Sequence, residues 1–177
     1  MLRVAQDLRA AHPDLRVVLP HRDPRVHALI SSQLQTAGAD FVELHRGEIH
    51  PALARAQVVL AKSGTGSLES CLIGTPTVIV FRVRGWFHRF VAHNLLNVPW
   101  FASANLIAGC EVVPELALVR EQDWHLATDR VEEMLRAGPT RDHCLAGLSE
   151  VRQRLGSGGA CQRAAKSLLP FCTSGPR

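Results

Sequence analysis

Residues 58–69 have the sequence VVLAKSGTGSLE, in which an apolar run is followed by a small turn with glycine and then by a helix-forming stretch. The pattern predicts a buried strand at about 58–61 that leads into a helix at about 66–73. Bare amides and the dipole at the N-terminus of such a helix favour a phosphate or diphosphate. We therefore expect Ser63, Gly64 and Thr65 to bind a diphosphate, and Glu69, one helical turn further on, to accept both hydroxyls of a ribose.

The same turn has a simpler interpretation. Ser63 or Thr65 is then only the N-cap of the helix, with Glu69 in a capping role. The segment alone does not separate the two interpretations, because a small residue followed by Ser-Gly-Thr is not a specific pattern.

The rest of the first half of the chain repeats the alternation of helix and strand. Short apolar strands separated by helical segments indicate a parallel sheet covered on both faces, so the sequence predicts an α/β fold with a Rossmann-like sheet layer. The further expected helices are 2–11, 24–37 and 50–55, and the further expected strands are 15–19, 41–44 and 77–81.

The second half turns helical from about residue 121. The expected helices are 121–136, 140–154 and 160–169, with a Gly-Ser-Gly-Gly run at 156–159 between the last two. We expect a Rossmann-like domain at 1–120, helices packing on it at 121–170 and a tail at 171–177. Because the chain opens with a helix, we also expect the first strand and loop of the sheet to be missing from it.

Composition narrows the class of protein. The net charge of +4 suits an anionic ligand or an anionic membrane surface and does not require nucleic acid. The five cysteines are scattered and never spaced as Cys-x-x-Cys, so neither a disulfide framework nor a metal site is indicated and a reducing cytosol fits best. The charged N-terminus excludes a signal peptide, and no apolar run approaches the ~20 residues of a membrane-spanning helix.

Three elements stand in order along the chain: Ser63-Gly64-Thr65 with Leu68-Glu69, Gly74-Thr75-Pro76, and SANLIAGCEVVPEL at 103–116. Together they resemble the C-terminal domain of the lipid-A-disaccharide synthase family, inverting glycosyltransferases of the GT-B fold, over about residues 1–155. The resemblance implies transfer of diacylglucosamine from UDP-2,3-diacylglucosamine to the lipid acceptor 2,3-diacylglucosamine 1-phosphate in lipid A biosynthesis. It adds Asn105, Glu111 and Glu115 to the expected UDP-sugar site, with no cofactor or metal.

The resemblance also implies a location and an incompleteness. The family's lipid substrates place it in the cytoplasm, peripheral on the inner face of the cytoplasmic membrane. Its acceptor site, its acid/base groups and a Gly-Ser-Arg loop would lie before Met1. We therefore expect this chain to be the donor-binding half only, with the catalytic residues in a missing N-terminal domain.

The chain departs from the family pattern at three positions. Ala104 stands where the family usually has proline, Cys110 where it has arginine, and Leu118 where it has glutamine. Two alternatives stay open beside the transferase: a non-catalytic nucleotide-binding module, which the departures favour, and another UDP-sugar enzyme of GT-B architecture such as an epimerase. The Asn-Leu-x-Ala-Gly element at 105–109 counts against the epimerase.

Aromatic and basic residues gather between 81 and 101. This stretch holds six of the nine aromatic residues, and no acidic residue lies between Glu69 and Glu111. An expected helix at 86–96 places apolar side chains on one stripe with basic residues beside it, which suits an anionic membrane interface. Packing against the missing N-terminal domain or a homodimer partner, or in an ordinary core, stays open. The residues proposed for this surface are Arg82, Arg84, Trp86, Phe87, Arg89 and Phe90.

Overall fold

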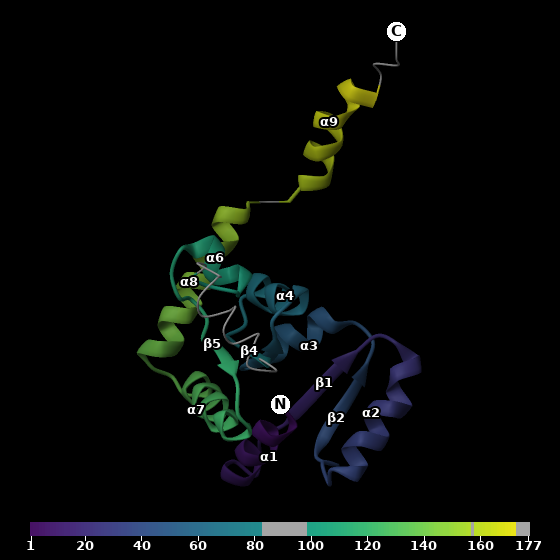
Figure 1. The fold of residues 1–177 in the computed structure, drawn as a ribbon, viewed down its shortest axis with the longest axis vertical. Coiled ribbons are helices and arrows are strands. Elements are labelled where there is room, and N and C mark those ends of the chain that lie inside the picture. The colour runs from purple at the N-terminus through teal and green to yellow at the C-terminus, as the bar shows by residue number, and fades with distance from the viewer. Residues whose placement is uncertain (83–98, 157, 173–177) are drawn as a thin grey trace.

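The computed structural model describes residues 1–82, 99–156 and 158–172, and shows an α/β fold in which parallel strands alternate with helices (Figure 1). The strands are β1 (Val17–His21), β2 (Val42–Arg46), β3 (Val59–Lys62), β4 (Thr77–Arg82) and β5 (Glu115–Leu118). The helices are α1 (Leu2–Ala11), α2 (Pro24–Thr36), α3 (Ile49–Arg55), α4 (Thr65–Ile73), α6 (Ser103–Ala108), the 3-10 turn η1 (Glu121–Asp123), α7 (Trp124–Leu135), α8 (Pro139–Leu155) and α9 (Ala160–Cys172).

The described strands form two parallel sheets. One has the order β1-β2 and the other β3-β4-β5. β4 is the central strand of the larger sheet, and its first four residues, 77–80, are all buried. A strand that is buried along its length reads as a continuous apolar run, which is why 77–81 was recognisable from the sequence.

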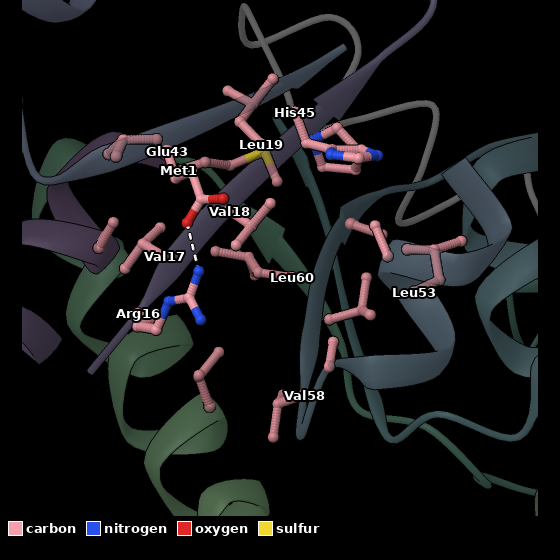
Figure 2. A pocket seen from close by; sticks show the side chains of 18 of the residues that line it. Met1, Arg16, Val17, Val18, Leu19, Glu43, His45, Leu53, Val58 and Leu60 are labelled. Carbon is pink, nitrogen blue, oxygen red and sulfur yellow. Dashed lines mark hydrogen bonds and ion pairs between the residues drawn. The ribbon is translucent and has the colours of Figure 1, made fainter. Parts of the chain in front are cut away.

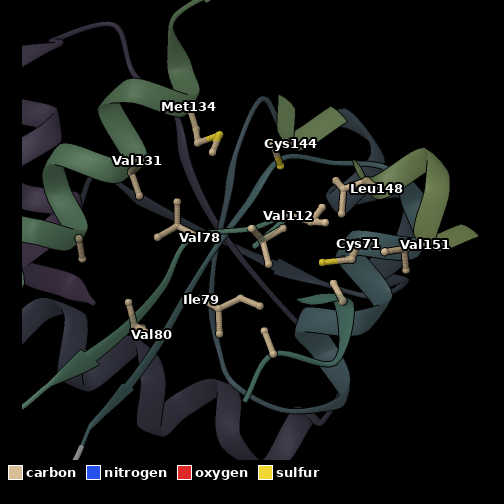
Figure 3. Packing of buried hydrophobic residues seen from close by; sticks show 14 of the residues in the cluster. Cys71, Val78, Ile79, Val80, Val112, Val131, Met134, Cys144, Leu148 and Val151 are labelled. Carbon is tan, nitrogen blue, oxygen red and sulfur yellow. The ribbon is translucent and has the colours of Figure 1, made fainter. Parts of the chain in front are cut away.

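The main core lies on the larger sheet, between β4 and the helices that cover it (Figure 3). The cluster includes Val78, Ile79 and Val80 of β4, Met134 of α7 and Leu148 of α8, and all five are at most 3% exposed. A smaller cluster around Leu34, Ala39 and Val42 holds α2 against the two-stranded sheet. The larger cluster therefore fixes the elements that follow β3, which carry the expected site.

The helices and strands expected up to residue 82 are confirmed, with bounds that differ from expectation by at most two residues. The strand expected at 15–19 runs instead from Val17 to His21. The amide of Leu15 donates to the carbonyl of His12, and the guanidinium of Arg9 donates to the carbonyl of Leu15. These bonds keep Leu15 in the turn after α1, so the strand begins two residues later.

The second half differs more from expectation. α6 and β5, which are six and four residues long, were not predicted as helix and strand. α6 lies inside the 103–116 element, and β5 begins in that element and ends at Leu118. The helices expected from 121 onward are confirmed as α7, α8 and α9, with residues 121–123 in η1. α7 packs on β4 and β5, and α8 packs on α4, α6 and α7. The described side chains of α9 are exposed, and Figure 1 shows this helix extending away from the rest of the chain.

The helix expected at 86–96 lies outside the described residues, and so do Arg84, Trp86, Phe87, Arg89 and Phe90. Among the residues that are described, no helix has both the length and the apolar character needed to cross a bilayer.

Candidate functional site

The turn between β3 and α4 is held to the neighbouring strand. The amide of Ser63 donates to the carbonyl of Val80, 3.1 Å away, so the turn begins at the carboxyl end of β3. Gly64 follows with φ of 147°, a conformation that a residue with a side chain rarely adopts. Glycine is therefore required here by the backbone, and it leaves the start of α4 uncovered.

Gly64 itself is the N-cap of α4, and no side chain among the described residues caps this helix. The capping interpretation of Ser63 or Thr65 is therefore wrong, because both lie beside the cap position and neither accepts a bond from the helix. Ser67 turns inward, and its hydroxyl and its amide both donate to the carbonyl of Gly64, at 2.6 and 3.2 Å. A Cβ built on Gly64 or on Gly66 would meet no described residue within 4 Å, so the part of the chain that the structure describes leaves the space in front of this N-terminus open.

Glu69 lies in the second turn of α4 and faces α3. Its Oε2 is 3.4 Å from Nε2 of His50, and the two side chains are 40% and 55% exposed. The carboxylate is accessible enough to accept further hydrogen bonds. His50 is a neighbour that the sequence did not suggest, because nineteen positions separate it from Glu69 and no local spacing links α3 to α4.

A cavity of about 1250 Å³ opens between the two sheets (Figure 2). Lys62, Gly66, Ser67 and Glu69 contribute to its wall, so one side of the α4 N-terminus borders it. The three turn residues 63–65 do not line this cavity. The expected diphosphate-binding turn and the cavity are therefore adjacent features with Gly66 between them.

Asn105 and Glu115 form the second part of the expected site. Asn105 is fully buried; its Oδ1 accepts the amides of Val112 and Val113 at 2.8 and 3.0 Å, and its Nδ2 donates to the carbonyl of Val113. A ligand contact through this side chain would have to break one of these bonds. The geometry makes Asn105 a residue that holds the 109–114 loop.

The carboxylate of Glu115 reaches the start of α6. It accepts the amides of Phe101 and Ala102 at 2.8 and 2.7 Å. Strand register places Glu115 beside Ile79, and Ile79 beside Ala61. Glu115 therefore lies two strand spacings, about 10 Å, from β3 and near the level at which the Ser63 turn begins.

Glu111 lies apart from these contacts. Its side chain is exposed and forms no ion pair within the described part of the chain, while its carbonyl is bonded to the His143 ring at 2.9 Å. The structure thus brings Asn105 and Glu115 together and leaves Glu111 on the loop near α8.

The three departures from the family pattern occupy different environments. Ala104 and Leu118 are each 1% exposed and belong to the main core. Cys110 is exposed. Only the change at Cys110 therefore alters a side chain that a ligand can reach.

Arg82 is the one member of the expected membrane surface that the structure describes. It ends β4 and pairs with Glu121 of η1, and both side chains remain about half exposed. Nearby, the rings of Phe81 and Phe101 lie 5.2 Å apart and tilted by 58°. Part of the positive charge expected for this surface is thus balanced within the fold.

Comparison with known proteins gives one consistent match. The family model for lipid-A-disaccharide synthetase matches residues 1–158. The lipid-A-disaccharide synthase of Anaeromyxobacter dehalogenans (strain 2CP-C) is 34% identical over 169 residues, covering 96% of this chain and 44% of that enzyme. The Myxococcus xanthus (strain DK1622) enzyme is 33% identical over 175 residues, covering 99% of this chain and 45% of its own length. The chain therefore spans less than half the length of these curated relatives.

Proposed function

This chain belongs to the lipid-A-disaccharide synthase family, and on that premise we propose that it is the donor-binding part of a transferase that uses UDP-2,3-diacylglucosamine. The acceptor is 2,3-diacylglucosamine 1-phosphate, and the product is the lipid A disaccharide. The reaction is inferred from the family, and the binding residues are inferred from the turn between β3 and α4.

One observation carries the assignment of the diphosphate to this turn. Among the described residues, α4 begins at a glycine with no side-chain cap, and a Cβ built on that glycine would meet nothing within 4 Å. Uncapped amides together with the helix dipole make a favourable place for a doubly charged diphosphate. Ser63 and Thr65 add hydroxyl donors on either side of Gly64, and the exposed Lys62 adds a positive charge.

The ribose is assigned to Glu69. A half-exposed carboxylate can accept two vicinal hydroxyls, and its contact with His50 is long enough to be replaced. Asn105 and Glu115 act as positioning residues in this proposal, because their polar atoms hold the 109–114 loop and the start of α6. Glu111 is assigned to the UDP-sugar site because it belongs to the family motif and its side chain is exposed.

An inverting transfer needs a base for the acceptor hydroxyl and stabilisation of the departing UDP. We assign only the second task to these residues. Hydrogen bonds from the α4 amides to the diphosphate strengthen as charge builds on the leaving group, which is the interaction that accelerates the step. The base is assigned to the part of the family's enzymes that this chain does not span.

The alternative functions lose support. Membership of the family argues against an epimerase. The interpretation as a non-catalytic module was favoured by three departures from the family pattern. Two of these, Ala104 and Leu118, lie in the core where no ligand reaches them.

We also propose that the 81–101 stretch brings the chain to an anionic membrane surface on the cytoplasmic side. The support is its composition: six aromatic residues, three arginines and no acidic residue. A lipid-linked donor and acceptor make such a contact useful, because both substrates are held in the membrane.

Calorimetric titration of UDP into the chain tests the nucleotide assignment. Glu69→Gln should weaken binding roughly tenfold to a hundredfold, since a charge-assisted hydrogen bond contributes about 1.5–3 kcal/mol. His50→Gln is the matched control, because it removes the same ion pair and leaves the carboxylate. Equal loss in both variants would count against a contact between Glu69 and the ribose.

A further inference from the structure

The helix α9 lies apart from the rest of the described chain. Figure 1 shows it extending away from the other helices, and its described side chains, those of residues 160–169 and Phe171, are all exposed. Residues 156–159 separate it from α8, and the three glycines among them have positive φ values. The described side chains of α9 therefore belong to neither hydrophobic cluster of the fold.

The residues of α9 divide between an apolar face and a polar face. At 3.6 residues per turn, successive side chains are separated by about 100° around the helix axis. The apolar side chains then fall within an arc of about 140°, and the polar ones fall within a second arc of about 140° on the opposite side. The apolar face consists of Ala160, Cys161, Ala164, Ala165, Leu168 and Phe171. The polar face consists of Gln162, Arg163, Lys166 and Ser167.

The apolar face carries large side chains near the end of the helix. Leu168 is 60% exposed and Phe171 is 79% exposed. A helix of 13 residues that packs on nothing is only marginally stable in water, because most helical stability in proteins comes from packing of an amphipathic face. A surface that covers Leu168 and Phe171 would therefore stabilise α9 as well as bind it.

Charge indicates what kind of surface this is. No acidic residue follows Glu150 in the sequence, whereas residues 151–177 contain five arginines and lysines. Within the described part of the chain, neither Arg163 nor Lys166 forms an ion pair, and the guanidinium of Arg163 donates to the carbonyl of Gly158 at 2.6 Å. The polar face of α9 therefore carries positive charge that no carboxylate balances there.

We propose that α9 lies in the interface of an anionic membrane, with Leu168 and Phe171 at the boundary of the acyl chains and Arg163 and Lys166 at the headgroup phosphates. Amphipathic helices with a basic polar face bind membranes in this way, and long basic side chains reach the headgroups while their stems cover apolar surface. A 13-residue helix is about 20 Å long, less than the ~30 Å hydrocarbon core, so α9 lies on the membrane and does not cross it. This surface is separate from residues 81–101, and the inference does not rest on the binding of UDP.

Amide hydrogen exchange of the chain, alone and with lipid vesicles, tests the proposal. The vesicles are made of phosphatidylcholine alone or of its equal mixture with phosphatidylglycerol. Without vesicles the amides of residues 160–172 should exchange fast, since α9 is a short helix without packing. The mixed vesicles should slow their exchange by at least about tenfold, and added salt should remove most of this effect. Because the measurement is local, a contact made through residues 81–101 alone leaves it unchanged.

Substitutions on the two faces of α9 test which face meets the lipid. Leu168→Gln/Phe171→Gln removes the large apolar side chains without changing the charge, and it should abolish the slowing of exchange. The matched control is Gln162→Ala/Ser167→Ala, which alters two residues of the polar face and should behave as the wild type does. Both variants should melt at the wild-type temperature, because α9 lies outside both hydrophobic clusters. Slowing that persists in Leu168→Gln/Phe171→Gln would overturn the proposal.

The paired change Arg163→Gln/Lys166→Gln tests the charge. It should weaken binding to the mixed vesicles at least about fivefold, since basic residues near an anionic surface attract it. Equal slowing of exchange on both kinds of vesicle, or on neither, would overturn the proposal. Slow exchange of residues 160–172 without vesicles would overturn it as well, because protein would then cover the apolar face, and dependence on protein concentration would identify that protein as a second copy of the chain.

Discussion

Nδ2 of Asn105 lies 3.3 Å from Oε2 of Glu115, and this contact joins the two ends of the 103–116 element. Asn105 holds the loop before β5, and Glu115 holds the amides before α6. The element therefore folds on itself, and its polar residues are engaged with its own backbone.

Replacing Asn105 should destabilise the fold strongly. Asn105→Ala leaves the amides of Val112 and Val113 buried without their acceptor, and each unsatisfied group costs about 1–3 kcal/mol. We expect the free energy of unfolding in urea to fall by at least about 2 kcal/mol. Leu106→Ala is the control on the same helix, since Leu106 is 50% exposed, and a similar loss in both would contradict the structural role of Asn105.

A second prediction concerns the contact between α8 and the same loop. A Cβ at Gly147 would lie 2.5 Å from Cγ1 of Val112, so Gly147→Ala should cost about 1–3 kcal/mol of stability although alanine favours a helix. Ser149→Ala, on the exposed side of α8, should be close to neutral.

The double variant Gly147→Ala/Val112→Ala separates overpacking from other causes. If the clash is responsible, the two changes should couple favourably by more than about 0.5 kcal/mol in a double-mutant cycle. Additive effects would show that Gly147 and Val112 do not meet as described.

The buried thiol of Cys71 predicts a loss of stability in alkali. Burial raises its pKa to about 11, whereas a cysteine in the unfolded chain titrates near about 8.5. The folded state keeps the proton that the unfolded state releases, so the contribution is complete below about pH 8.5 and is lost as pH rises toward 11. Urea unfolding at several pH values should show a shallower alkaline decline in Cys71→Ala than in the wild type, and parallel declines would contradict the assignment.

Binding to lipid vesicles tests the surface proposed for residues 81–101. Anionic vesicles should bind the chain, and added salt should weaken the binding because exposed charges are screened over about 8 Å at physiological ionic strength. Neutral vesicles are the control. Equal binding to both kinds, or to neither, would argue for packing against protein instead.

Much of the fold was predictable because the central strand β4 is buried over its first four residues and several helices begin or end at residue types that are typical of helix ends. Asp23 and Pro24 begin α2, and Gly74 ends α4, as these residue types suggest. α6 and β5 were missed because they are too short for periodicity to show, and the bonds of Asn105 and Glu115 determine their ends.

The candidate site was predictable in part. The strand, the turn and the helix at 58–73 were placed by local pattern, and the backbone conformation of Gly64 explains why glycine stands there. The pairing of Glu69 with His50 and the burial of Asn105 depend on packing between distant segments, which one sequence does not reveal.

The central claim is that UDP binds at the N-terminus of α4, and two variants of Gly66 test it most directly. Gly66 is in the first turn and lacks the positive φ of Gly64, and a Cβ added there would meet none of the described atoms within 4 Å, so a side chain fits beside the residues that the structure describes. Gly66→Asp places a carboxylate beside the free amides, where the helix dipole stabilises it by about 0.3–1 kcal/mol. Its thermal stability should therefore hold or rise, while the same charge repels a diphosphate.

The measurement is calorimetric titration of UDP into the wild type, Gly66→Asp and the neutral isostere Gly66→Asn. The account predicts that the wild type binds, that Gly66→Asn binds more weakly and that Gly66→Asp loses at least about tenfold more affinity than Gly66→Asn, or about 1.4 kcal/mol. A folded wild type that does not bind UDP, or a Gly66→Asp variant that binds it as well as Gly66→Asn does, would contradict the account.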